Sequence, residues 1–298
     1  MSIRLPGPFW VGLAAFLWAT DALVRFPTIA SVDPTFIVFF EHVLAVVLLF
    51  PWIYKNHKDL MFRLNGAEWF SALFSGLAGS AFATLFFTAS FQYLNPSVAV
   101  LLQKLQPVLV MLIAWIFLKE TPNPKFFLLG SIAIASAILL SFPDFQFPFI
   151  TQDFSFDFTG VQYALGAALL WAGSTVTGKK LLIRTPPLLA TFWRFFFGFL
   201  GLSAFLLVSK TTLHWEILTP SPLLYSLIYL SLIPGLFAML IYYYGLASTP
   251  ASVTSFIELI YPIGAILLNT LYLHTPLNTV QTLSGAILLV AVGLMSRF

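Results

Sequence analysis

The chain is patterned as long apolar runs separated by short polar breaks. A helix that crosses a bilayer needs about 20 apolar residues, and ten runs reach that length. They lack the strict alternation of a membrane β-barrel strand. The sequence therefore predicts an all-α integral membrane protein with ten transmembrane helices. These are expected at residues 8–29, 34–54, 67–92, 96–118, 123–142, 159–179, 187–209, 222–246, 251–273 and 277–297.

Composition narrows the class of protein. Of 298 residues, 59% are hydrophobic and 8% are charged, whereas soluble domains are about a quarter charged. The basic residues form no continuous face, which argues against nucleic acid as a partner. Cysteine is absent, the four histidines are not at metal-ligand spacing, and no HExxH or G-x-S-x-G motif occurs. We therefore expect contact with lipid, no cofactor or metal, and no enzyme activity.

Lysine and arginine predict the orientation. With the N-terminus in the cytoplasm, the termini and even-numbered connections carry ten basic residues, and the odd-numbered connections carry only Lys210. The ten are Arg4, Lys55, Lys58, Arg63, Lys119, Lys125, Lys179, Lys180, Arg184 and Arg297. Positive charge gathers on the cytoplasmic side of membranes. We predict a multi-pass protein of the cell (inner) membrane with both termini in the cytoplasm.

The chain also repeats itself. A shift of 155 residues places Pro107 on Pro262 and Gly130 on Gly285, and a shift of 153 places Trp18 on Trp171. Each half holds five predicted helices, and an odd number makes the second half enter the membrane from the opposite side. The predicted organisation is two inverted five-helix repeats joined by an external loop, at residues 1–142, 143–158 and 159–298.

Inverted repeats are typical of secondary transporters, whose substrate sites lie near the midplane between the halves. A duplicated scaffold without transport, a channel and, less favoured, an integral-membrane enzyme remain as alternatives.

With these two repeats, the chain resembles the drug/metabolite transporter superfamily in its ten-helix EamA-like form. The resembling stretches are 87–141 and 242–296, and Lys119-Glu120 resembles the family's ending of the fourth helix. His274-Thr275 at the equivalent place in the second half is a departure, and so is Glu41. The resemblance implies a cavity lined partly by helices 4 and 9, and export of a metabolite rather than import.

Ionisable residues within the spans are costly, roughly 2.5–3.5 kcal/mol each at the bilayer centre, and mark functional sites with partners. The acids are Asp21, Glu41 and Glu258, and the bases are Arg25, Lys104 and Arg194. Asp21 and Arg25 are four residues apart, which favours an ion pair on one helix face. The alternative has Asp21 lining the pathway opposite Ser174.

Glu41 and Arg194 occupy equivalent positions in the two repeats, each the eighth residue of its helix. Both are expected about 12 Å deep from opposite faces, within reach of a cross-half ion pair. His42 could join them and titrate near neutrality. Two roles stay open, a structural pair and a gate or site of proton coupling.

The best candidate for substrate binding is a pair of polar patches on helices 4 and 9. Gln103 and Gln106 are three residues apart, as are Glu258 and Tyr261, so each pair shares a helix face. Hydrogen bonding between helices is the alternative role. Trp18 and Trp171 add aromatic surface.

Helix 3 carries a stripe of hydroxyl residues at a spacing of four, which includes Thr84 and Thr88. Close helix packing is expected, with a pathway wall as the alternative. Of Tyr242, Tyr243 and Tyr244, we expect at least two to anchor the protein at the membrane interface.

The substrate these groups suit is a small amphipathic or zwitterionic metabolite such as an amino acid. Drug efflux is the alternative. Protons are a candidate coupling ion, and we expect a monomer or a weak homo-oligomer.

Overall fold

The protein is described here by a computed structural model. It covers residues 6–106, 108–110, 112–113, 124–142, 144–145, 158–209, 211, 219, 221–249, 257–258 and 260–295. Within these ranges the regular structure is helical, as the sequence predicts. Several residues discussed above lie outside them: Arg4, Pro107, Lys119, Glu120, Lys210, Ser296, Arg297 and all of the predicted linker except residues 144, 145 and 158.

The described helices of the first half are α1 (Gly7–Ala19), α2 (Asp21–Thr28), α3 (Pro34–Met61), α4 (Gly66–Phe74), η1 (Ser75–Phe82), α5 (Ala83–Ser90), α6 (Pro96–Gln103) and α8 (Pro124–Ser141). Those of the second half are α10 (Thr159–Leu182), α11 (Pro187–Ser209), α12 (Pro222–Leu230), η3 (Ser231–Phe237), α13 (Ala238–Ser248), α15 (Ile260–Tyr272) and α16 (Thr279–Met295). Their bounds agree with the predicted spans to within a few residues, except at the end of α3, the end of α6 and the start of α15.

Helix starts follow the chemistry of the polar breaks. The side chain of Asp33 accepts a hydrogen bond from the Thr35 amide at 2.7 Å, and that of Asn95 accepts one from the Ser97 amide at 2.8 Å. In both helices a proline follows the capping residue, where its missing N–H costs nothing. These two breaks therefore begin α3 and α6.

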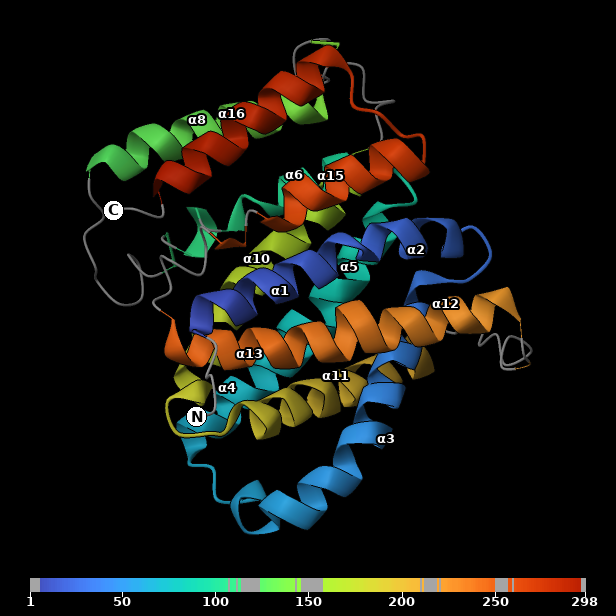
Figure 1. The fold of residues 1–298 in the computed structure, drawn as a ribbon, viewed down its shortest axis with the longest axis vertical. Helices are drawn as coiled ribbons and strands as arrows, with labels where there is room; N and C mark the ends of the chain where they lie inside the picture. Colours follow the sequence, from blue (N-terminus) through green and yellow to red (C-terminus); the bar gives the residue numbers. More distant parts are fainter. Residues whose placement is uncertain are drawn as a thin grey trace.

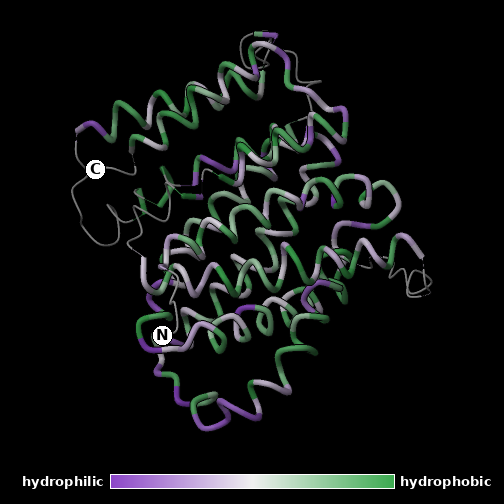
Figure 2. Tube along the Cα trace, in the orientation of Figure 1, coloured by the Kyte–Doolittle hydropathy of each residue, from purple (hydrophilic) through white to green (hydrophobic). Residues whose placement is uncertain are grey.

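Five helical segments are long and apolar enough to cross a membrane: Gly7–Thr28, Pro34–Met61, Gly66–Ser90, Pro187–Ser209 and Pro222–Ser248. Four more are apolar but shorter within the described residues. The more polar α10 packs against α5, η1, α4 and α6. Figure 2 shows hydrophobic residues along most helices and hydrophilic ones at the turn between α3 and α4.

The two halves pack in a symmetric pattern (Figure 1). Equivalent helices of the two halves pair with each other: α3 with α11, α6 with α15, and α8 with α16. Other contacts also cross between the halves, since α1 packs on α13 as α10 packs on η1 and α5. The start of α1 and the end of α16 lie on the same side of the molecule (left in Figure 1). This is the arrangement expected of two inverted repeats.

Both halves contain a π-helical segment at the middle of their third helix, η1 and η3. A π-helix shifts the backbone hydrogen bonds to i→i+5. One carbonyl in each of these two segments accepts a hydrogen bond from a tryptophan side chain. The indole of Trp171 donates to the Gly79 carbonyl at 2.8 Å, and that of Trp18 donates to the Pro234 carbonyl at 3.0 Å. The tryptophans matched by the repeat thus hold equivalent backbone irregularities from opposite halves.

Helices 4 and 9 are interrupted at equivalent positions. The helix α6 ends at Gln103, with a turn at Lys104, and a turn at Glu258 precedes α15. Four residues beyond Gln103 and Glu258 stand Pro107 and Pro262. A proline has no N–H for the carbonyl four residues earlier and its ring crowds that carbonyl. The matched prolines therefore account for breaks at the two polar positions.

We predict that Gly79→Ala destabilises the contact between η1 and α10. A Cβ at Gly79 would overlap the Ser174 side chain and lie 3.2 Å from Nη1 of Arg194. Overpacking of this kind costs about 1–3 kcal/mol, so thermal unfolding in detergent should begin at a lower temperature. Gly66→Ala is the control, because a Cβ there meets nothing within 4 Å. Equal midpoints for the two variants would contradict the prediction.

Candidate functional site

A cavity of about 170 Å³ lies between the two halves. It is lined by all six of the intramembrane ionisable residues, three acidic and three basic, together with a wall of aromatic side chains. Twelve of the thirteen residues singled out from the sequence line it: Trp18, Asp21, Glu41, His42, Thr84, Gln103, Gln106, Trp171, Ser174, Arg194, Glu258 and Tyr261. Thr88 is not among the lining residues, but it contacts one of them. The shared location supports a common site, and the binding roles stay predictions.

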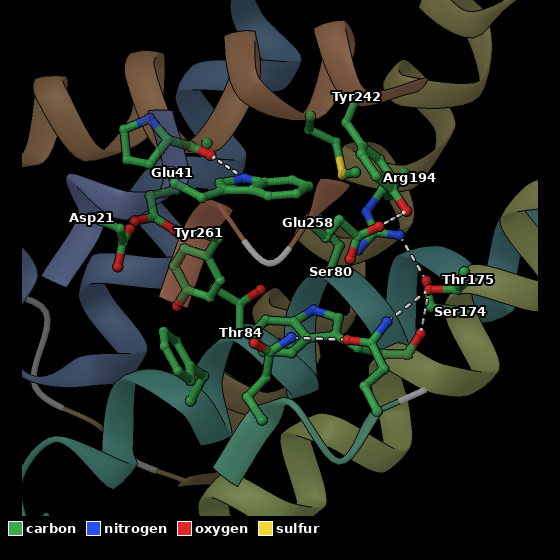
Figure 3. A pocket seen from close by; sticks show the side chains of 18 of the residues that line it. Asp21, Glu41, Ser80, Thr84, Ser174, Thr175, Arg194, Tyr242, Glu258 and Tyr261 are labelled. Atoms are coloured by element: carbon green, nitrogen blue, oxygen red, sulfur yellow. Dashed lines mark hydrogen bonds between the residues drawn. The ribbon is translucent and has the colours of Figure 1, made fainter. Parts of the chain in front are cut away.

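A charged cluster around Arg25 forms part of the cavity lining. Its guanidinium donates to both carboxylate oxygens of Asp21 at 2.7 Å and to Oε1 of Glu41 at 2.7 Å. A further bond runs from Nη1 to Oγ1 of Thr88 at 3.0 Å. These residues are buried and join α2, α3 and α5. The ion pair expected of Asp21 and Arg25 is confirmed. Asp21 also lines the cavity, across from Ser174 in Figure 3, and its place on a transport pathway stays a prediction.

The expected ion pair between Glu41 and Arg194 is wrong. Glu41 pairs with Arg25, which reaches it from the first helix of the same half. Arg194 donates to Oγ of Ser174 at 2.7 Å, to the Gly79 carbonyl at 2.8 Å and to the Tyr243 hydroxyl at 3.3 Å. Depth alone suggested the pair, but each side chain finds nearer partners at its own end of the cavity.

His42 also has partners other than the expected ones. Its Nδ1 contacts the Val38 carbonyl at 2.7 Å and its Nε2 contacts Oγ of Ser80 at 2.9 Å. The ring packs edge-on against Phe195, with centroids 5.3 Å apart, and a Cβ at Gly198 would lie within 2.6 Å of Nε2. Both ring nitrogens are thus engaged at the contact of α3 with η1 and α11.

The patches on helices 4 and 9 meet the cavity with different chemistry. Nε2 of Gln103 donates to Oε1 of Gln106 at 2.8 Å, and Nε2 of Gln106 donates to Oγ1 of Thr175 at 3.0 Å. On the other patch, Oε1 of Glu258 accepts from the Tyr242 hydroxyl at 2.8 Å. The helix 4 patch therefore presents amide groups, and the helix 9 patch presents a carboxylate.

Lys104 connects these patches. Its ammonium nitrogen lies 4.7 Å from the centre of the Tyr261 ring, a favourable cation–π distance. It is also close enough to Glu258 for their charges to attract. Lys104 is buried, so these contacts replace the water that its charge has lost.

The expectation for the three tyrosines is wrong for two of them. Tyr242 and Tyr243 are buried and line the cavity, whereas Tyr244 is 52% exposed, as an interfacial anchor would be. The error arose because three consecutive residues on a helix point in directions about 100° apart, so they cannot share one role.

A comparison with protein families agrees with this architecture. The EamA-like transporter family matches residues 5–142 and 158–297. The chain belongs to the EamA-like transporter family. It is therefore a membrane transporter, and not an enzyme.

Its relatives span the whole length of this EamA-like chain. The riboflavin transporter ImpX of Fusobacterium nucleatum is 27% identical over 306 residues, which cover 100% of this chain and 99% of the relative. The uncharacterized transporter YwfM of Bacillus subtilis is 26% identical and covers 96% and 92%. A solved structure without a functional description matches with a TM-score of 0.66 at 17% identity over 98% and 97% of the chains, which supports the fold alone.

Several lining residues of this EamA-like protein were not singled out for the site, namely Phe87, Thr175, Phe195, Pro234, Gly235, Met239 and Leu246. Thr175 had a usable signal, because it stands four residues after Trp171 and next to Ser174. The apolar residues had none, since a phenylalanine in an apolar helix looks the same whether it faces lipid or a cavity. Among the described residues, no group of three or more histidines and acids is placed to hold a metal ion.

We predict that Arg25→Met destabilises the protein strongly. It leaves the carboxylates of Asp21 and Glu41 buried without their cation, and breaking such a cluster costs about 3–5 kcal/mol. The folded fraction after mild heating in detergent, measured by gel filtration, should fall sharply. The matched control is Arg184→Gln, since that arginine pairs with Glu68 at 3.5 Å with 73% of its side chain exposed, and exposed pairs contribute little. Similar losses in both variants would refute the prediction.

Proposed function

We propose that this protein is a secondary active transporter that works by alternating access, with its substrate held in the cavity between the two halves. The observation that carries the proposal is the placement of two polar clusters on one cavity. The Arg25 cluster ties α2 to α3 and α5, and the Arg194 cluster ties α11 to α10, η1 and α13. Opening one while the other stays closed would expose the cavity to each side in turn, which a channel does not require.

The lining favours a small amphipathic or zwitterionic metabolite, such as an amino acid. The partly buried carboxylate of Glu258 suits an ammonium group, and the buried Lys104 and Arg194 suit a carboxylate. Aromatic surface from Trp18 and Trp171 suits an apolar side chain. We propose export as the direction, as the family resemblance implies, from an inner membrane with both chain ends in the cytoplasm, as the distribution of basic residues implies.

A flavin is the second candidate substrate, favoured by one specific observation. The relative that matches this chain over its full length is a riboflavin transporter. The cavity wall includes four aromatic side chains that can face a flat ring, those of Trp18, Phe87, Trp171 and Tyr261. Phe87 and Trp171 already contact each other, with ring centres 5.3 Å apart.

Counterflow in proteoliposomes tests the proposed function. Vesicles are loaded with unlabelled amino acids or with riboflavin, and uptake of the labelled compound is followed against protein-free vesicles. A carrier exchanges one molecule for another, so we expect labelled substrate to accumulate transiently above its equilibrium level. Uptake that never exceeds equilibrium would indicate a channel. Thermal stabilisation by hydrophobic cations alone, with no exchange of either class, would indicate drug efflux.

Proton coupling, if Glu41 carries it, should disappear in Glu41→Gln. The groups that face Glu41 are Arg25, which bonds it, and Asp21, which shares that arginine. The amide keeps the shape and removes the proton site, so substrate binding should persist while transport loses its dependence on an imposed pH gradient. Transport by the Gln variant at several gradients measures this. An unchanged pH dependence would exclude Glu41 as the coupling residue.

A further inference from the structure

The starting observation is a hydrogen-bond chain whose direction is fixed at one end. Oγ1 of Thr175 lies 2.9 Å from the carbonyl oxygen of Trp171, four residues earlier on α10. A carbonyl only accepts, so the single hydroxyl proton of Thr175 is used there. Thr175 can then take part in a second bond only as an acceptor.

The fixed direction of the Thr175 bond also sets the direction of the next two hydrogen bonds, those of Gln106 and Gln103. Because Thr175 accepts, Gln106 must present its NH₂ group to it, as it does at 3.0 Å. The amide oxygen of Gln106 is then turned toward Gln103 and accepts from its NH₂ group at 2.8 Å. Each amide has one oxygen end and one nitrogen end, so Gln103 is left with its oxygen at the free end.

The free end is a buried acceptor without a donor. Among the residues that the structure describes, Oε1 of Gln103 has no hydrogen-bond partner, although the residue is only 7% exposed and lines the cavity. A buried polar atom without a partner is rare and costly in native proteins. Lys104, the neighbouring cation, lies over the Tyr261 ring instead of bonding this oxygen.

We propose that the transported substrate supplies the missing donor, an N–H or O–H group that binds Oε1 of Gln103, and that Thr175 is the positioning residue that keeps the oxygen of this amide, and not its NH₂ group, at the free end of the hydrogen-bond chain. The inference rests on the proposed function and deepens it by naming what the substrate must carry. The backbone carbonyl of Trp171 fixes the direction of the hydrogen-bond chain through Thr175 (labelled in Figure 3), and the side chain of Trp171 is part of the aromatic wall of the cavity. An amino acid would supply this donor from its ammonium group, and a flavin would supply it from the N–H of its imide edge.

Matched pairs of compounds test the proposal on the full-length protein in proteoliposomes. One pair is riboflavin and its N3-methyl derivative, which lacks the imide N–H. The other is an amino acid and its N-trimethyl derivative, which lacks every ammonium N–H. Competition against counterflow gives the apparent affinity of each compound. We expect the methylated member of the transported pair to bind about 10- to 100-fold more weakly, because it leaves Gln103 unpartnered.

Two substitutions at Thr175 separate positioning from packing. Thr175→Val keeps the shape but removes the fixed acceptor, so both glutamines can reverse. Discrimination within the pair should then largely disappear, because a reversed Gln103 no longer presents an acceptor to the substrate N–H. Thr175→Ser keeps the hydroxyl and should restore it. Thr191→Val is the control, because Thr191 bonds the Pro187 carbonyl at 2.8 Å in the same way on α11 and does not line the cavity.

The outcomes distinguish a failure of the proposed function from a failure of the inference about Gln103 and Thr175. If neither pair exchanges, the proposed function fails for these substrate classes, and the inference fails with it. If one pair exchanges but the methylated member binds equally well, only the inference is overturned. Discrimination that survives in Thr175→Val, or is lost equally in Thr191→Val, would remove the positioning role of Thr175.

Discussion

The structure depends on the requirement that charges and polar groups inside a bilayer be satisfied by the protein itself, because lipid offers no hydrogen bonds. Three acids and three bases within the helices meet this requirement by gathering around one cavity. Arg25 bonds two carboxylates and a hydroxyl, so that it neutralises one side of the cavity. Arg194 finds no carboxylate partner among the described residues and relies on a hydroxyl pair and a backbone carbonyl. Charged partners thus hold Arg25, whereas neutral partners hold Arg194.

The same requirement governs the backbone. Irregular backbone is tolerated at membrane depth only where it is buried in protein or lines a cavity, and the interruptions here occur in those places. The π-helical segments expose the carbonyls of Gly79 and Pro234, and the indoles of Trp171 and Trp18 bond them from the opposite half. Each half therefore supplies a donor that the other half needs. Trp18 and Trp171 therefore belong both to the cavity lining and to the contact between the repeats.

The fold was predictable from sequence because span length, capping residues and prolines act locally. Asn95-Pro96 begins a helix whatever surrounds it, and Pro262 disturbs the turn of Glu258. The partners of Gln103 were partly predictable, since Gln106 is three residues away on the same face. The partners of Glu41 and Arg194 were not, because depth in the membrane leaves open which neighbour a long side chain meets. Arg25 reaches Glu41 from its own half, and the sequence held no signal that ranked it above Arg194.

The relation between the repeats bears on how the transporter has a direction. The backbone irregularities occur at equivalent positions of the two repeats. They are two π-helical segments, two carbonyls bonded by an indole, and two breaks four residues before a proline. In the proposed alternating-access cycle, these matched features would give the inward-open and outward-open states similar conformational energy. The side chains at equivalent positions differ, with Glu41 against Arg194 and Gln103 against Glu258. Because a ligand shifts such an equilibrium only by its differential affinity for the two states, these unequal pairs are where substrate or protons can favour one state over the other.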